Sequence, residues 1–161
     1  MKYLHSVFVG HPFSTDKTAP LRQAVQEICD SLTQESNETI LWQPEFWHEL
    51  HSASPASILE VVRQSIQEST LSIFEISDTS KANIFFEAGL CIGMDRHAVF
   101  IADNYNPPSD LAGIRMIVYK DWADLKLQLT RVFRSRIEDL QKPPKPNERT
   151  IYQKMQIDLA W

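Results

Sequence analysis

The sequence has little of several features that would point to particular classes of protein. Its 161 residues include two cysteines and four glycines, with no metal-ligand spacing and no glycine-rich phosphate loop. No apolar run approaches the ~18 residues needed to cross a bilayer, and the N-terminus is too polar and short for a signal peptide. Positive charge is also scarce, because 16 Lys and Arg face 21 Asp and Glu. We therefore expect a cytoplasmic protein with no metal site, no direct binding to nucleic acid and no membrane association.

The bulk composition is that of a soluble globular protein, with 43% hydrophobic and 23% charged residues. The chain length fits one domain with a buried core. Cys29 and Cys91 both lie in apolar helical patterns. This placement favours buried free thiols in a reducing compartment over the alternative, a disulfide.

Five short apolar segments, separated mainly by helical patterns, read as strands. They cover residues 3–9, 39–42, 71–76, 97–102 and 114–119. Helices are expected from Pro20, with Thr18 or Ala19 as the cap, from Pro55, around Glu87 and after a capping Asp121. Hairpin signals are absent from the sequence. This alternation predicts an α/β fold with a parallel sheet, helices on both faces and right-handed crossovers.

The third strand and the helix after it contain the most informative residues. Residues 71–76 read as a buried strand, yet Glu75 lies within it and a polar turn, residues 77–80, follows. The helix then places three apolar residues at i, i+4 and i+8, namely Phe86, Leu90 and Met94. Glu87 lies beside them near the first turn. Because ligands bind outside the carboxyl ends of parallel strands, we expect Glu87 to face a ligand crevice.

Two further loops follow predicted strands. The loop over residues 10–20 leads into a helix N-terminus that can hold a phosphate, although a plain connector fits equally well. The loop that follows Trp42 has an unusual aromatic content. Trp42 and Phe46 could pack beneath it as a small core, whereas Trp47 and His48 could form a rim, a lid or a structural contact.

The chain changes character after Gln141. A proline-rich linker leads into an apolar tail, so we expect an α/β domain over residues 1–141 and a separate segment over 142–161. The tail has enough apolar residues to dock on its own domain, on another subunit or on a further domain.

Several segments together resemble bacterial Toll/interleukin-receptor-like (TIR-like) domains, in the branch related to nucleoside 2-deoxyribosyltransferase-like proteins. They are VFVGHPF at 7–13, SIQESTLSIFEIS at 65–77, NIFFEAG at 83–89 and PSDLAGI at 108–114. The resemblance covers roughly residues 5–135. It implies a flavodoxin-like three-layer fold, cleavage of the nicotinamide N-glycosidic bond of NAD as substrate, and a role in bacterial immunity. It also implies a homo-oligomer or an activating partner protein.

The resemblance assigns roles to particular residues. Glu87 falls on the glutamate that acts as nucleophile in the deoxyribosyltransferase relatives. The nucleotide substrate would contact the loops after the first three strands, and we expect these contacts at Gly10, His11, Pro12, Phe13, Ser14, Asp16, Trp47, Ser77, Asp78 and Asn83. Ile84, Phe85 and Phe86 replace the tryptophan–cysteine pair that often precedes this glutamate in receptor-type TIR domains.

The chemistry itself also requires a carboxylate. Breaking an N-glycosidic bond builds positive charge on the ribose, which one carboxylate below C1′ can stabilise or attack. Nicotinamide leaves as a neutral molecule, whereas a purine would need a proton donor, and Asp78 or Glu75 could serve if burial raised its pKa. Three functions remain open: an NAD glycohydrolase or ADP-ribosyl cyclase, a deoxyribosyltransferase or nucleotide N-glycosidase, and a non-catalytic nucleotide-binding or assembly module.

Overall fold

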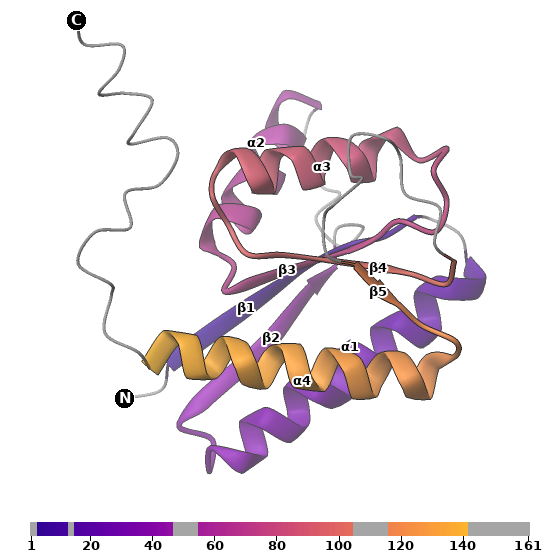
Figure 1. Cartoon of the computed structure of the whole chain (residues 1–161). Coiled ribbons are helices and arrows are strands. Elements are labelled where there is room, and N and C mark those ends of the chain that lie inside the picture. Colours follow the sequence, from indigo (N-terminus) through magenta and orange to yellow (C-terminus); the bar gives the residue numbers. More distant parts are fainter. Residues whose placement is uncertain (1–2, 13–14, 47–54, 105–115, 142–161) are drawn as a thin grey trace, which may run out of the picture.

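The computed structural model describes residues 3–12, 15–46, 55–104 and 116–141 (Figure 1). Strands and helices alternate along most of the chain. They are β1 (Tyr3–Gly10), α1 (Thr15–Glu35), β2 (Ile40–Phe46), α2 (Pro55–Glu68), β3 (Leu71–Glu75), α3 (Ala82–Gly93), β4 (Ala98–Ala102), β5 (Met116–Val118) and α4 (Trp122–Gln141). The predicted tail at 142–161 lies outside the described residues.

The strands form one five-stranded sheet in the order β2-β1-β3-β4-β5, and every neighbouring pair is parallel. Helices α1 and α4 cover one face, while α2 and α3 cover the other (Figure 1). This strand order is that of flavodoxin-like folds. The predicted three-layer architecture is therefore confirmed.

Two hydrophobic clusters, one on each face, hold the layers together. Alternate strand residues point to opposite faces, so Ile73 packs with α1 and α4, whereas Phe74 packs with α2 and α3. Val7, Val9 and Phe8 divide in the same way along β1. Strands buried on both faces need continuous apolar runs, which explains why they were readable from the sequence.

The start of α1 and the end of β2 differ from the prediction. Helix α1 begins at Thr15, so Pro20 lies inside it. A proline at this position removes the one intrahelical hydrogen bond that its missing N–H would have donated. Strand β2 continues through Pro44 to Phe46, where a loop was expected. Since β2 is an edge strand, Pro44 can leave its outer side without a ladder hydrogen bond.

Several local predictions are confirmed. The side chain of Asp121 accepts a hydrogen bond from the Asp124 backbone N–H at 2.8 Å and so caps α4. Cys29 and Cys91 are buried free thiols. Trp42 is buried in the core and packs against Phe133.

Within the described ranges, no helix combines the length and the apolar character needed to cross a membrane.

Candidate functional site

The candidate site lies at the carboxyl edge of the sheet, where β1 and β3 are neighbours. Their register places Gly10 opposite Phe74. The chain leaves β1 toward β2 on one side and leaves β3 toward β4 on the other. In open parallel sheets, such a reversal of strand order creates the crevice in which ligands bind.

Glu87 lies on the buried side of α3, the helix that packs over β1, β3 and β4. Glu87 is 3% exposed, and Ile84, Ala88 and Cys91 on the same helix are also buried. The expected apolar stripe is wrong at Phe86, which is 56% exposed. The helix is rotated so that its small and branched residues face the sheet, and this rotation turns Glu87 inward.

Gly10 makes room for the carboxylate. A Cβ at this position would lie 2.9 Å from Glu87 Oε2 and 2.8 Å from Phe74 Cδ1. Both distances are shorter than any ordinary contact of a Cβ atom. Glycine at the end of β1 therefore lets the Glu87 carboxylate approach the backbone of β1, beside the reversal of strand order.

Burial dominates the electrostatics of Glu87. Its Oε2 is buried and has no hydrogen-bond partner among the residues that the structure describes. Desolvation raises the pKa of this carboxyl from 4.5 to about 7. A buried carboxylate without a partner is costly, which makes Glu87 a candidate functional group.

The β1–α1 connection is held by His11. Its ring is buried and meets Phe46 edge-on at a centroid distance of 6.0 Å. Nδ1 lies 2.9 Å from the Pro12 carbonyl oxygen, and since a carbonyl can only accept, Nδ1 donates. Thr18 Oγ1 donates to the same carbonyl at 3.2 Å. These contacts fix the conformation of His11 and Pro12 directly after Gly10.

Asp78 shapes the turn before α3. Its Oδ1 accepts hydrogen bonds from the Ser80 backbone N–H at 3.0 Å and from the Ser80 hydroxyl at 2.6 Å. These bonds lower the pKa of Asp78. The condition set for Asp78 as a proton donor, a pKa raised by burial, is therefore not met. Asn83 is exposed on the first turn of α3.

Glu75 belongs to a second buried polar cluster, on the opposite face of the sheet from Glu87. It follows Ile73 by two positions and therefore points toward α1 and α4. Its Oε1 accepts hydrogen bonds from the Ser77 hydroxyl and, at 3.2 Å, from the Ser77 N–H. Burial raises the pKa of Glu75, while Ser77 and Lys17 oppose that rise.

The same cluster ties three connections together. Ser77 Oγ accepts a hydrogen bond from the Asp103 N–H at 2.9 Å, and Asp103 pairs with Lys17 on α1. The hydroxyl of Tyr119, after β5, is buried nearby and has no hydrogen-bond partner within the described part of the chain. Its pKa is raised by burial and then by the charge of Glu75. Ser77 is thus a structural link between the connections after β3 and β4.

Sequence reasoning missed Lys17, Asp103 and Tyr119, and it considered Thr18 only as a helix cap. Their only signal is a position just past a strand end or in the first turn of a helix, which is weak by itself. Phe13, Ser14 and Trp47 lie outside the described residues, as does the side chain of Asp16. Among the described residues, no three His, Cys, Asp or Glu side chains gather as metal ligands do.

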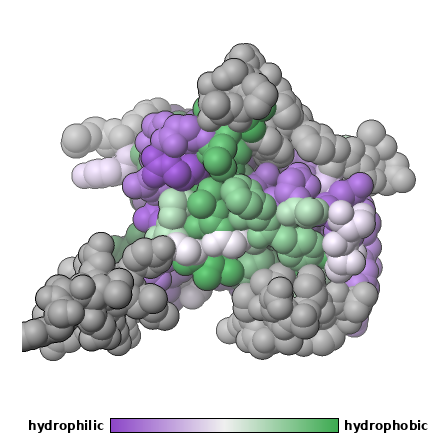
Figure 2. Space-filling view, turned by 90° about the horizontal axis from the view of Figure 1, so that it is seen from above, coloured by the Kyte–Doolittle hydropathy of each residue, from purple (hydrophilic) through white to green (hydrophobic). Residues whose placement is uncertain are grey.

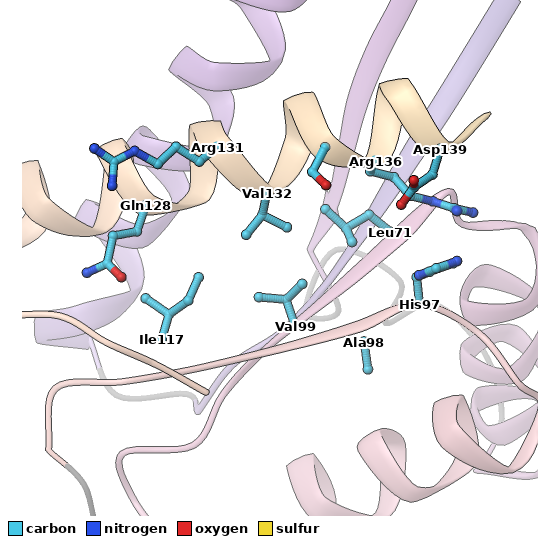
Figure 3. Close-up of a pocket in the computed structure, with 11 residues that line it drawn as sticks. Leu71, His97, Ala98, Val99, Ile117, Gln128, Arg131, Val132, Arg136 and Asp139 are labelled. Carbon is cyan, nitrogen blue, oxygen red and sulfur yellow. The ribbon is translucent and has the colours of Figure 1, made fainter. Parts of the chain in front are cut away.

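A separate cavity of about 520 Å³ lies between α4 and strands β3 to β5 (Figure 3). Its floor is apolar, whereas His97, Arg136 and Asp139 form one end and Gln128 and Arg131 the other. Of the predicted site residues that the structure describes, none lines it. The cavity lies on the face of the sheet covered by α1 and α4, opposite the face on which α3 packs.

Comparison with known proteins found similarity only at the level of structure. No family model matches the sequence, and no curated protein matches it. A CMP N-glycosidase from Clostridium botulinum is similar with a TM-score of 0.59 and 12% identity, over 77% of this chain and 97% of that chain. A 2-deoxyribosyltransferase from Bacillus psychrosaccharolyticus gives 0.56 and 9%, over 75% and 90%.

At these identities the likeness shows a shared fold. It agrees with the deoxyribosyltransferase-like side of the resemblance seen in the sequence. The TIR-like side stays a prediction.

Proposed function

We propose that the protein cleaves the N-glycosidic bond of a nucleotide or deoxynucleoside, with Glu87 as the carboxylate that acts at C1′. One observation carries this proposal: a buried carboxylate oxygen without a partner lies against Gly10 at the reversal of strand order. The fold shared with a CMP N-glycosidase and a 2-deoxyribosyltransferase supports it.

The environment of Glu87 suits this reaction. As the bond from C1′ to the base nitrogen lengthens, positive charge develops on the ribose ring. In a water-poor site, an ionised Glu87 interacts with that charge far more strongly than it would in water. Burial costs free energy for the ionised carboxylate before the reaction. Attraction to the positive charge that develops on the ribose offsets this cost. The carboxylate is therefore complementary to the transition state and not to the ground state.

The bonds can be followed through the reaction. The electron pair of the breaking C–N bond leaves with the base, and Glu87 shares an oxygen lone pair with C1′. Water then supplies a hydroxyl group to C1′ and releases Glu87 as a carboxylate, while its proton balances the departing base. In a transferase, a second base would replace that water.

A substrate panel tests the proposal. The full chain is incubated with nucleoside 5′-monophosphates, with deoxynucleosides and with NAD, and released base is separated by chromatography. We expect free base from one of the first two groups, and a loss of about 100-fold to 1000-fold in Glu87→Gln. Nicotinamide release from NAD alone would instead identify the NAD glycohydrolase or cyclase predicted from the sequence.

Glu138→Gln is the matched control, because it makes the same chemical change at an exposed position on α4. It should keep full activity. Equal base release by the wild type and Glu87→Gln would refute the role of Glu87. Nucleotide binding without turnover, retained in Glu87→Gln, would identify a non-catalytic module.

A further inference from the structure

The cavity between α4 and strands β3 to β5 has the size and lining of a small-molecule site (Figure 3). Its volume of about 520 Å³ falls within the roughly 300–1,000 Å³ of such sites. Four aliphatic side chains line its centre, namely Leu71, Val99, Ile117 and Val132. Leu71 is buried, whereas the other three are only partly buried. A ligand with an apolar body would remove this exposed surface from water.

The packing of α4 explains why this space is open. Its buried side chains Leu125, Leu129 and Phe133 join α1 and the neighbouring strands in one hydrophobic cluster. On the other flank of α4, the edge strand β5 has only three residues, so little of the sheet lies beneath the helix there. The apolar surface at the centre of Figure 2 belongs to the α2/α3 layer, which covers the opposite face of the sheet.

Two arginines are anchored to neighbouring backbone carbonyls beside one end of the cavity. Arg136 donates from Nε to the Thr70 carbonyl oxygen at 3.1 Å. Arg96 donates from a terminal nitrogen to the Ser69 carbonyl oxygen at 2.5 Å, while its Nε is buried without a hydrogen-bond partner in the described ranges. Burial, and then the charge of Arg96, lowers the pKa of Arg136. Two like charges are thus held near each other, which costs free energy that a bound anion would offset.

The acidic residues nearby compensate these charges only in part. Asp139 lines the same end of the cavity, and Asp95 acts on His97. Among the residues that the structure describes, neither Arg96 nor Arg136 forms an ion pair with a carboxylate. His97 lies at the same end as Arg136 in Figure 3, and burial followed by the charge of Arg136 lowers its pKa. At neutral pH the imidazole is therefore uncharged and can donate one hydrogen bond.

We propose that this cavity binds a small organic carboxylate, with its apolar body on the aliphatic centre and its carboxylate group between Arg136 and His97. The terminal nitrogens of Arg136 keep their N–H groups for the ligand, because the bond to Thr70 uses Nε. One guanidinium end and one imidazole N–H match the single charge and two oxygens of a carboxylate. The site does not depend on the proposed reaction, since it lies on the opposite face of the sheet from Glu87.

Titration of the isotope-labelled full chain with octanoate, followed through amide chemical shifts in NMR spectra, measures both the affinity and the place of binding. Octanol has the same apolar body without the charge, and acetate has the charge without the body. Octanoate should bind at least about tenfold more tightly than either, because it makes both kinds of contact. The largest shifts should fall on β4, β5 and α4. No binding of octanoate, equal binding of octanoate and either control, or shifts centred on Gly10 and Glu87 would overturn the proposal.

Two matched substitutions test the cationic end. Arg136→Gln should weaken octanoate binding about 10-fold to 100-fold, because glutamine carries no charge. Arg134→Gln makes the same chemical change on the same helix, where the guanidinium pairs with Glu35 at 2.8 Å outside the cavity. This control should leave the affinity unchanged. Equal losses in the two variants would show a general effect of charge and contradict the assignment of Arg136.

Val132→Phe tests the apolar centre without altering a charge. The larger ring should fill the cavity and abolish octanoate binding, while a cooperative thermal transition shows that the variant is folded. Unchanged octanoate affinity in this variant would place the ligand elsewhere and refute the proposal. A synthetic peptide of residues 142–161 that displaces octanoate would identify the tail of the chain as the occupant, which would also overturn it.

Discussion

The most direct test of the site is the stability of Glu87→Gln as a function of pH. Glutamine keeps the shape of the side chain but cannot ionise. Burial raises the pKa of the wild-type carboxyl to about 7 in the folded protein, against 4.5 for an unperturbed glutamate in water. Between pH 4.5 and about 7, the folded state therefore holds a proton that the unfolded state has already lost.

The sign and size follow from linkage. Below pH 4.5 both states are protonated, and the variant and wild type differ only by a constant amount. As the pH rises toward 7, the unfolded wild type ionises first, so the wild type loses stability. The difference of about 2.5 between the two pKa values corresponds to about 3 kcal/mol. Above pH 7 the loss is complete, and Glu87→Gln should be relatively more stable by that amount.

Urea unfolding of both proteins between pH 4.5 and 8.5 measures the effect. Subtracting the unfolding free energies of the two proteins removes the contribution of every titrating group that both proteins share. In thermal unfolding, 3 kcal/mol corresponds to about 6 to 12 °C for a chain of this size. Glu138→Gln, the exposed control, should give a flat difference. A flat difference for Glu87→Gln as well would refute the assignment of a buried, unpaired carboxyl.

Further predictions concern activity and the two carboxyl groups. The kcat/KM for base release should rise with pH and level off above about 7, because the Glu87 carboxylate acts ionised; a fall over this range would identify a proton donor. Gly10→Ala should cost about 1–3 kcal/mol in urea unfolding and reduce base release, since its Cβ would displace Glu87 or Phe74; unchanged values would contradict the close approach. Glu75→Leu should cost about 1–3 kcal/mol more than Glu75→Gln, because only glutamine keeps an acceptor for the N–H and hydroxyl of Ser77. Equal urea midpoints for these two variants would show that the hydrogen bonds to Glu75 contribute nothing.

Local sequence patterns were sufficient for most of the architecture. The parallel α/β fold followed from apolar strands separated by helices, because strands buried on both faces need nearly continuous apolar runs. The cap at Asp121 depends on near neighbours in the chain. The limits of α1 and β2 were wrong, since tertiary packing overrode the local signals of Pro20 and Pro44.

The sequence by itself determined that a carboxylate, Glu87, stands on the helix after the central strand, near the edge where parallel sheets bind ligands. Only the tertiary structure decided which way that helix is turned. Its rotation buries Glu87 against Gly10, a residue far from it in sequence, and leaves Phe86 in solvent. The cluster that joins Glu75 to Asp103 and Lys17 is also a product of tertiary structure. Such contacts depend on the packing of distant elements, which no local periodicity encodes.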